Sequence, residues 1–404
     1  MKTVAVFFGG QTVEHDVSVL TGLQVMGALD SSRFTALPVY LAPDGTWFTG
    51  EALKDRASYM LTDEIRRGLT RVGLLAGRPA ASGPALTAVD RRRLGGVDLR
   101  EIPFDIALPA MHGTGGEDGG LQGLFQLLHI PFVGSGALGS AATMDKAFTK
   151  RVLMGLGIPV VPFLQVERPE DGRFIDADTI GQRLASELAG LSYPFCVKPN
   201  NLGSSVGVAR VTSADELTAS LLSIFRMDRA AVIEAFVPNL VEYNVAVTRA
   251  FGKTQVSAIE RPLGKSAVLN FADKYLQEGG KASKVEGSVT EGMASAVRVL
   301  HPAELSADQI RRIEDHARRA FEAFDMHGAA RIDFLCDSAT GEIWLNEINS
   351  IPGSLSYYLW EPSALKLGFT DLLTGLIEEG FAQGRAARAD TGADGAHATI
   401  FTRR

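Results

Sequence analysis

The chain has 404 residues, 46% of them hydrophobic and 22% charged, and its formal net charge is −7. This composition is typical of a globular protein with two or three domains, and the lack of a large basic block disfavours a nucleic-acid partner. No apolar segment approaches the roughly 18 residues of a membrane span, and the N-terminal apolar run is too short for a signal peptide. We therefore expect a cytoplasmic protein with no membrane partner. Cys196 and Cys336 lie in apolar runs and are expected to be buried thiols.

The first region alternates strand and helix signals, which is the pattern of a parallel α/β layer. The expected strands are residues 4–8, 37–41 and 104–110, and the expected helices lie around 19–26 and 121–128. Residues 50–100 have weaker patterning, and we interpret them as surface elaboration with a hairpin or two.

A second region is expected to begin near Ala137 with one helix that runs through Asp145 to about Met154, where a glycine and then a proline end it. The expected strands of this region are residues 160–166, 195–198 and 206–211. A capping-box pattern that starts at Ser213 predicts a further helix after them.

The third region begins near residues 231–235, with long strands expected at 242–249 and 254–261. A second capping-box pattern, at Ser306, predicts a helix that runs to about Phe324. The last helix is expected around 371–381. From Arg385 onward the sequence has no periodicity, so the tail is expected to be disordered.

Two short segments of this third region concentrate oxygen ligands. Arg331 and Asp333 alternate along one predicted strand, and Glu347 and Asn349 alternate along the next. Alternation sends each pair to one face, where the side chains can converge. Three oxygen ligands beside a fixed cation suit Mg²⁺ and the phosphates that it bridges. On this stretch alone, a salt-bridged pair of strands is an equal alternative.

A loop of small residues, KPNNLGSSVG, follows the strand that ends at Lys198. Its backbone N–H groups can fold over phosphates while Lys198 supplies charge. It is not a Walker A loop, because the lysine precedes the glycines and a strand follows. A plain hairpin turn is the alternative for this loop taken alone. Lys146, on the preceding helix, would supply a second cation, about what ATP with Mg²⁺ requires.

Weaker signals mark the surroundings of such a site. The apolar strand end at residues 233–237 exposes backbone that can bind an adenine edge, and Glu242 can hold ribose hydroxyls or simply cap a strand. Two glycine-rich loops carry Glu14 and His112 to the carboxyl ends of parallel strands, where open α/β sheets bind ligands. The first loop lacks the glycine spacing of a dinucleotide fingerprint, which disfavours a Rossmann oxidoreductase.

Together these groups predict a carboxylate-activating ligase. ATP phosphorylates a substrate carboxylate, two cations and Mg²⁺ offset the charge, and an amine then attacks the acyl phosphate. Arg331 would lie near the transferring phosphate and the oxyanion. No Ser-His-Asp or Cys-His arrangement in the sequence competes for the chemistry.

Seven motifs carry a resemblance to the ATP-grasp enzymes, and within them to the D-alanine–D-alanine ligase family. In chain order they are GGQTVEHDVS, HGTGGEDGGLQG, MDK, KPNNLGSSVG, DKY, RIDF and NEINSIPG. The resemblance extends from residue 2 to about 380, apart from residues 50–100. It implies an α/β, three-domain ATP-grasp fold, in which a parallel α/β substrate domain is followed by two α+β domains that clasp ATP. The implied bounds are 1–136, 137–234 (the lid) and 235–384 (the catalytic domain), with a tail at 385–404.

The resemblance also implies the reaction and its ligands. The substrates would be ATP and D-alanine, and the product a D-alanyl-D-alanine dipeptide for peptidoglycan synthesis, formed through D-alanyl phosphate. The cofactors would be ATP and two Mg²⁺ ions, for which Mn²⁺ can substitute. A homodimer through the N-terminal domain is implied as well.

Residue by residue, the resemblance implies the catalytic groups Glu14, Ser204, Tyr275 and Arg331 and the substrate-binding groups His112, Lys274, Gly353 and Ser354. Glu14 would orient the amino group of the first D-alanine and bond to Ser204 and Tyr275, while Arg331 and the Gly353 backbone would stabilise the tetrahedral intermediate. The implied nucleotide-binding residues are Lys146, Lys198, Ser205, Glu234, Phe236, Val237 and Glu242. The implied Mg²⁺ ligands are Asp333, Glu347 and Asn349.

One departure from the family concerns the second substrate. Many members carry a serine where this chain has Tyr358, and that serine helps to bind the acceptor carboxylate; Ser354 or Ser356 are candidates to replace it. The loop around Tyr275 is also longer than usual. The leading hypothesis is a D-alanine–D-alanine ligase, because Tyr275 disfavours the depsipeptide-forming relatives. The alternative is the same chemistry with D-serine, D-lactate or another amino acid as acceptor.

Two further hypotheses fit the sequence less well. An ATP-binding regulator on a retired ligase scaffold predicts a missing lysine or Mg²⁺ ligand, and none is missing. A carboxylase of the wider ATP-grasp group would not explain Glu14, Ser204 and Tyr275.

Overall fold

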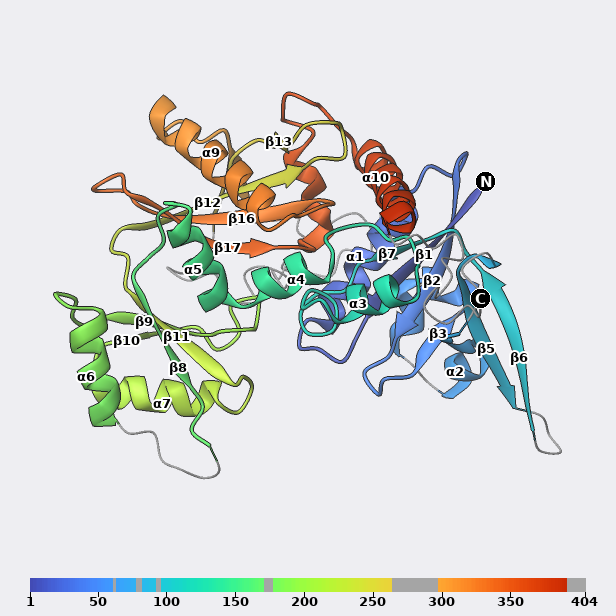
Figure 1. Ribbon diagram of the computed structural model, residues 1–404, viewed down its shortest axis with the longest axis horizontal. Helices are drawn as coiled ribbons and strands as arrows, with labels where there is room; N and C mark the ends of the chain where they lie inside the picture. Colours follow the sequence, from blue (N-terminus) through green and yellow to red (C-terminus); the bar gives the residue numbers. More distant parts are fainter. Residues whose placement is uncertain (61–62, 78–81, 92–95, 171–176, 264–296, 391–404) are drawn as a thin grey trace, which may run out of the picture.

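The computed structural model describes residues 1–60, 63–77, 82–91, 96–170, 177–263 and 297–390. Its strands form three sheets, of seven, four and six strands. The three sheets and their helices make up separate regions of the molecule, with the helix pair α4 and α5 between them (Figure 1).

The seven-stranded sheet has the order β6-β5-β4-β3-β2-β1-β7. Strand β1 (Lys2–Gly9), next to the edge strand β7 (Ile106–Pro109), is parallel to β7 and to β2 (Phe34–Leu41), as the alternation of strand and helix signals predicted. The other strands are antiparallel: β3 (Trp47–Thr49), β4 (Thr70–Gly73), β5 (Ala85–Arg91) and β6 (Val97–Pro103). Residues 50–100 are therefore more than surface elaboration, because four strands between positions 47 and 103 widen the sheet and β5–β6 is the expected hairpin. Short helices η1 (Glu51–Lys54), η2 (Arg56–Met60) and α2 (Asp63–Gly68) connect β3 to β4.

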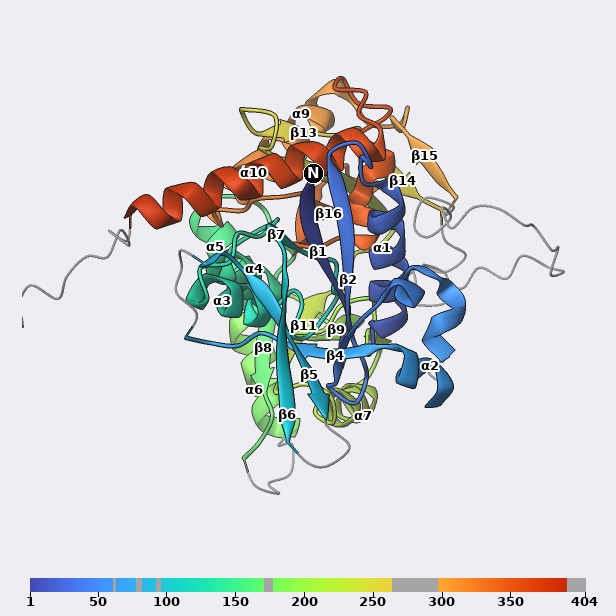
Figure 2. The same cartoon turned by 90° about the vertical axis from the view of Figure 1, so that its right-hand side faces the viewer.

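Helices from both ends of the chain cover this sheet. They are α1 (His15–Ala28), α3 (Gly120–Leu127) and the long α10 (Phe369–Asp390), which crosses near the N-terminus in Figure 2. Buried side chains of β1, α1 and α10, such as Phe8, Leu23 and Leu373, belong to one apolar core. The start and the end of the described chain thus stabilise each other through burial of apolar surface.

The prediction of a tail from Arg385 was wrong for its first residues. Helix α10 continues to Asp390, beyond the expected end near residue 381. Alanine and arginine, which fill positions 385–389, are strong helix formers, so a helix already anchored by Leu372 and Leu376 can extend through them. Residues 391–404 lie outside the described part of the chain.

The four-stranded sheet has the order β10-β9-β11-β8. Its strands are β8 (Phe163–Glu167), β9 (Phe195–Pro199), β10 (Ala209–Val211) and β11 (Ala230–Ala235), all antiparallel. Helices α6 (Ala177–Glu187) and α7 (Ala214–Ile224) cover one face, where Val197 and Ile233 are buried. Alternation along the strands sends Lys198 and Glu234 to the opposite face. The predicted cap of α7 is confirmed, since the Ser213 hydroxyl accepts from the Glu216 N–H at 3.2 Å.

The third sheet contains the oxygen-rich strand pair. Its strands are β12 (Leu240–Thr248), β13 (Gln255–Val256), β14 (Glu260–Pro262), β15 (Arg298–Leu300), β16 (Ala330–Asp337) and β17 (Ile343–Asn349). The single strand expected at 254–261 is instead two short strands, β13 and β14. Helix α9 (Ala307–Ala323) packs on this sheet through residues such as Ile313 and Phe321. Its predicted capping box is confirmed, with both Ser306–Gln309 hydrogen bonds present.

The helix expected from Ala137 to Met154 is in fact two helices, α4 (Ala137–Met144) and α5 (Lys146–Gly155). Asp145 between them has extended backbone angles, and its carboxylate accepts from the Phe148 N–H at 2.8 Å. Aspartate competes with helical hydrogen bonding and prefers this N-cap role. The break at Asp145 gives α5 its own direction.

Both cysteines are free; Cys336 is buried as expected, whereas Cys196 is only partly buried. Among the described helices, none combines the length and the apolarity of a membrane-spanning segment.

Candidate active site

Two adjoining cavities bring together the predicted site residues of all three sheets. The first cavity is lined by, among others, Glu14, His112, Glu117, Lys146, Ser204, Arg331, Glu347, Asn349 and Gly353. The second cavity is lined by, among others, Lys146, Lys198, Ser205, Glu234, Phe236, Val237, Glu242, Asp333 and Glu347. Lys146 and Glu347 line both cavities, so one site with two compartments lies between the sheets.

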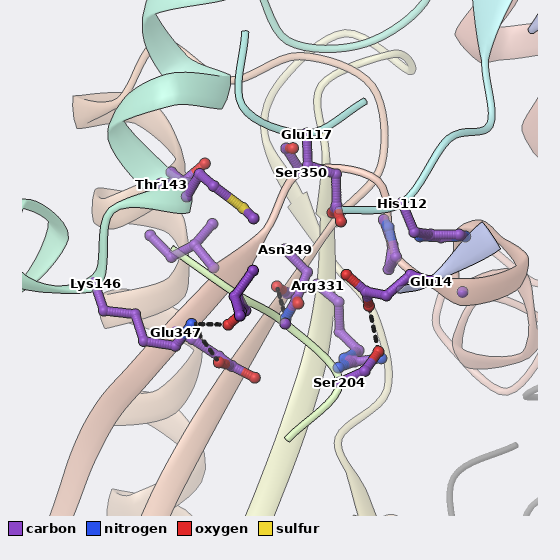
Figure 3. Close-up of a pocket in the computed structure, with 16 residues that line it drawn as sticks. Glu14, His112, Glu117, Thr143, Lys146, Ser204, Arg331, Glu347, Asn349 and Ser350 are labelled. Atoms are coloured by element: carbon purple, nitrogen blue, oxygen red, sulfur yellow. Dashed lines mark hydrogen bonds and ion pairs between the residues drawn. The ribbon is translucent and has the colours of Figure 1, made fainter. Parts of the chain in front are cut away.

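Glu14 and Ser204 join the first region to the loop after β9. Glu14 ends the glycine turn after β1 and precedes α1, and it is 5% exposed. Ser204 lies in the small-residue loop with a positive φ of 51°, and its hydroxyl donates to Glu14 Oε1 (Figure 3). The expected Glu14–Ser204 contact is therefore present, and it places a carboxylate at the wall of the first cavity.

His112 is a buried, neutral imidazole at the end of β7. Its Nε2 lies 2.8 Å from the Thr21 hydroxyl, and its backbone N–H donates to the Ser18 hydroxyl at 2.8 Å. Burial lowers the pKa of His112 to about 4. The ring consequently presents a polar but uncharged edge to the first cavity near neutral pH.

Glu117, to which the sequence analysis assigned no role, is a second carboxylate in the first cavity. It accepts from the Gly113 N–H at 2.8 Å and from the Ile351 N–H at 3.2 Å. Burial, together with the nearby Glu14 charge, raises its pKa to about 8. Its buried surroundings depend on Ile351, which follows β17 and is far from Glu117 in the sequence, so no local sequence signal predicts them.

The predicted convergence of the oxygen-rich strands is confirmed. Arg331 pairs in register with Asn349, and Asp333 with Glu347. Arg331 donates two hydrogen bonds of 2.7 Å to the two oxygens of Asp333, and Asn349 Nδ2 lies 3.1 Å from Asp333 Oδ2. The bidentate ion pair with Arg331 compensates the negative charge of Asp333, which is 8% exposed. Lys146 Nζ lies 3.9 Å from Glu347 Oε2, and the two side chains meet at the first cavity (Figure 3).

The carboxylates Asp333 and Glu347 with the Asn349 amide form a two-carboxylate donor set. No group of three or more His, Cys, Asp or Glu residues fit to hold a metal occurs in the described ranges. Mg²⁺ in phosphate-transferring sites needs only one or two carboxylates, since phosphates and water complete its shell. The donor set therefore fits Mg²⁺ bound together with a phosphate ligand.

A buried ion triad forms one wall of the second cavity. Glu234 on β11 contacts Lys198 Nζ of β9 at 2.7 Å and Lys150 Nζ of α5 at 2.8 Å. Burial would raise the pKa of Glu234, but the two lysines outweigh it and lower that pKa, so the carboxylate is ionised. Lys198 also donates to Asn346 Oδ1 at 2.9 Å. Lys150 was missed in the sequence analysis, although its position four residues after Lys146 places both on one helical face.

Asn200 ties the two lysine-bearing elements together. This fully buried residue follows β9, and its carbonyl and side-chain oxygens accept from the N–H groups of Lys146 and Ala147 at 3.0 and 2.9 Å. Lys146 Nζ in turn donates to the Leu202 carbonyl at 2.5 Å. The start of α5 and the loop after β9 are thereby held as one unit.

The comparisons with known proteins agree with this geometry. Residues 3–135 match the family model described as D-ala D-ala ligase N-terminus, and residues 152–378 match D-ala D-ala ligase C-terminus. The chain belongs to the D-alanine–D-alanine ligase family. A D-alanine–D-alanine ligase of Deinococcus radiodurans is 35% identical over 93% of this chain and 98% of its own. One of Heliobacterium modesticaldum is 32% identical over 95% and 96%.

Solved structures of family members share this fold. The D-alanine–D-alanine ligase of Coxiella burnetii superposes with a TM-score of 0.74 at 25% identity, covering 97% of both chains. The D-Ala:D-Ser ligase VanG of Enterococcus faecalis superposes with a TM-score of 0.72 at 25% identity, covering 94% of this chain and 99% of its own. The fold of this member of the ligase family is accordingly the ATP-grasp fold, as the resemblance implied.

Helix η5 (Gly353–Leu359) carries the departure from the family pattern. Gly353 lines the first cavity, whereas Ser354 is buried and its N–H donates to the Thr21 hydroxyl at 3.3 Å. Tyr358 is 8% exposed, and the Arg298 guanidinium lies 3.7 Å from its ring centroid. The Tyr358 hydroxyl has no hydrogen-bond partner among the described residues. Its ring is therefore a packed group at the position where the family resemblance implies a serine.

Two expected site residues, Lys274 and Tyr275, lie outside the described residues. The remaining expected nucleotide residues line the second cavity, where the Arg210 guanidinium lies 5.0 Å from the Phe236 ring centroid.

Proposed function

We propose that this chain is an ADP-forming ligase that joins two D-alanines. ATP phosphorylates the carboxylate of the first D-alanine, and the amine of the second then attacks the acyl phosphate, which breaks the acyl–oxygen bond and releases phosphate. The single observation that carries the proposal is the continuity of the two cavities. The first cavity holds a carboxylate that can bind an ammonium group (Glu14), the second holds a lysine pair that can bind phosphates, and the two cavities meet at Lys146 and Glu347.

In this proposal the second cavity binds ATP. Lys146 and Lys198 hold the phosphates, with Ser205 of the loop between them, because two cations offset polyphosphate charge. Glu234, Phe236 and Val237 meet the adenine, and Glu242 holds the ribose. The support is that all of these residues line one cavity.

Asp333, Glu347 and Asn349 would hold Mg²⁺, and a bound divalent ion would supply charge neutralisation to the transferred phosphate. Arg331 would change partner from Asp333 to the phosphate or the oxyanion when the carboxylate is engaged elsewhere. The backbone N–H of Gly353 would assist Arg331 at the oxyanion.

The first cavity would bind the amino acids. Glu14, held by Ser204, orients the ammonium group of the first D-alanine. His112 lies at the acceptor side, where a neutral imidazole edge adds no charge that would oppose a nucleophilic amine. Cytoplasmic location and a homodimer stay predictions from the family resemblance.

The test is phosphate release by the pure protein with ATP and Mg²⁺, first with D-alanine alone and then with D-serine or D-lactate added. Product mass is read from the same reactions. D-alanyl-D-alanine from D-alanine alone is the expected result, and a product formed only with another acceptor would overturn the proposal.

A matched variant tests the metal assignment. Glu347→Gln keeps the side-chain volume but removes one carboxylate charge, so turnover is expected to fall at least about 100-fold while thermal unfolding is little changed. Wild-type turnover by this variant would contradict the assigned Mg²⁺ site.

A further inference from the structure

The fully buried Lys150 reaches the nucleotide wall through its ion pair with Glu234. Lys150 is 0% exposed and is absent from the lining of the second cavity, whereas Glu234 lines it. The Lys150 ammonium lies 2.8 Å from Glu234 Oε1 and 5.8 Å from the Phe163 ring centroid on β8. A buried charge of this kind is costly unless it has a specific partner.

The charges around Glu234 favour its anionic form. Lys150 of α5 and Lys198 of β9 each contact one of its oxygens. Cys196 lies directly opposite on β9, and Glu347 of β17 adds a more distant negative charge to the lysines. The triad contains two cations for one anion, so removal of Lys150 would leave Glu234 with a single counter-charge in a buried position.

The Glu234 carboxylate retains hydrogen-bonding capacity toward the second cavity, which Glu234 lines. Its Oε1 is buried 2.8 Å from the Lys150 ammonium, and its Oε2 lies 2.7 Å from Lys198 Nζ. Each oxygen contacts one lysine, whereas an ionised carboxylate offers about four lone-pair sites. An anionic oxygen can accept from an amino group but has no proton to donate to a carbonyl. Adenine carries an amino group at position 6, whereas hypoxanthine carries an oxo group there.

We infer that Lys150 is a positioning residue that holds Glu234 in place as an anion and thereby selects a 6-amino over a 6-oxo purine nucleotide. The inference rests on the proposed function, because it takes the second cavity to hold the base of ATP. It assigns the specificity to a side chain that does not touch the ligand. A protonated or displaced Glu234 would lose this selectivity, since it could donate to the oxo group of ITP.

The experiment compares ATP with ITP, two nucleotides that differ at position 6 and its ring neighbour. Affinities of both are measured by calorimetry, and KM and kcat by D-alanine-dependent phosphate release. Lys150→Met is expected to lower the ATP-over-ITP preference by about 10- to 100-fold, the range of one hydrogen bond to a charged group, with the change in KM rather than in kcat for ATP. Lys150→Arg, which keeps the charge, is the matched control and is expected to retain most of the preference.

A second pair of variants separates this role from a purely structural one. Glu234→Gln can both donate and accept, so it is expected to lose the preference as well, and the Lys150→Met/Glu234→Gln double variant should lose no more than either single variant. Lys150→Gln is measured in the same way if Lys150→Met does not fold. An unchanged ATP-over-ITP ratio in folded Lys150→Met or Lys150→Gln would overturn the inference. Wild-type protein that binds ATP but forms no dipeptide would instead refute the proposed function and leave the binding test intact.

Discussion

Tyr358 offers a direct test of whether the family departure at η5 is structural or functional. Its hydroxyl is buried without a partner among the described residues, and burial raises its pKa, so the hydroxyl is neutral. Its ring packs under Arg298, whose Nε lies 3.3 Å from Glu260. Tyr358→Phe removes only the hydroxyl, whereas Tyr358→Ser removes the ring and introduces the residue that the family resemblance implies at this position.

The two substitutions are expected to affect the free energy of unfolding differently. A buried hydroxyl without a hydrogen bond opposes folding, so Tyr358→Phe should leave the free energy of unfolding unchanged or raise it by up to about 1 kcal/mol. Tyr358→Ser leaves a cavity of the kind that costs about 3–5 kcal/mol in aromatic-to-alanine series. It also removes a cation–π contact of about 0.5–2 kcal/mol, part of which overlaps with the cavity cost.

Urea unfolding followed by circular dichroism measures both variants, with a check that the slope of the transition is unchanged. The KM for D-alanine is measured alongside and should be unaffected in Tyr358→Phe. A Tyr358→Phe protein that is destabilised by more than about 1 kcal/mol, or that needs several-fold more D-alanine, would show that the hydroxyl has a partner, and the argument from packing would fail.

Three other groups of the protein can be tested in the same way. Ser204→Ala removes the hydroxyl that donates to Glu14, so the KM for D-alanine is expected to rise about 10-fold or more in phosphate-release assays, and Ser204→Thr should retain part of the affinity. Asp145→Ala removes the cap of α5 and should lower the free energy of unfolding by about 1 kcal/mol in urea titrations, whereas Asp145→Asn should lose little. Because folding raises the pKa of Glu117 from 4.5 to about 8, the folded state binds more protons between these values, and this group's stabilising contribution is lost as pH rises from 4.5 through 8. Glu117→Gln should therefore flatten stability across that range in thermal unfolding scans, and an unchanged pH profile would contradict the assignment of a protonated Glu117.

The parts of the site that the sequence predicted rest on local rules. Alternation along β16 and β17 required only that the two strands be neighbours, so the convergence of Asp333 and Glu347 could be expected from the sequence alone. The caps at Ser213 and Ser306 are set by residues three positions apart. Six of the seven motifs also predicted segments that line the cavities, whereas the DKY motif lies outside the described residues.

The parts that were missed depend on contacts between distant segments. Glu117 and Lys150 owe their surroundings to Ile351 and Glu234, which are far from them in the sequence, and a helical lysine or a loop glutamate is usually solvent-exposed. The break at Asp145 was hidden because apolar residues continue on both sides of it. The strands between positions 47 and 103 are short, so their pairing and not their pattern defines them.

The link through Asn200 has a consequence for the energetics of nucleotide capture. Lys146 and Lys198 are like charges that repel each other, and bringing them near a common ligand has a free-energy cost. Because Asn200 bonds the start of α5 to the segment after β9, the free-energy cost of this repulsion belongs to folding and is not added to the binding of ATP. The polyphosphate therefore binds to two lysines that are already in place. The repulsion between these lysines should lower the stability of the folded protein when no nucleotide is bound.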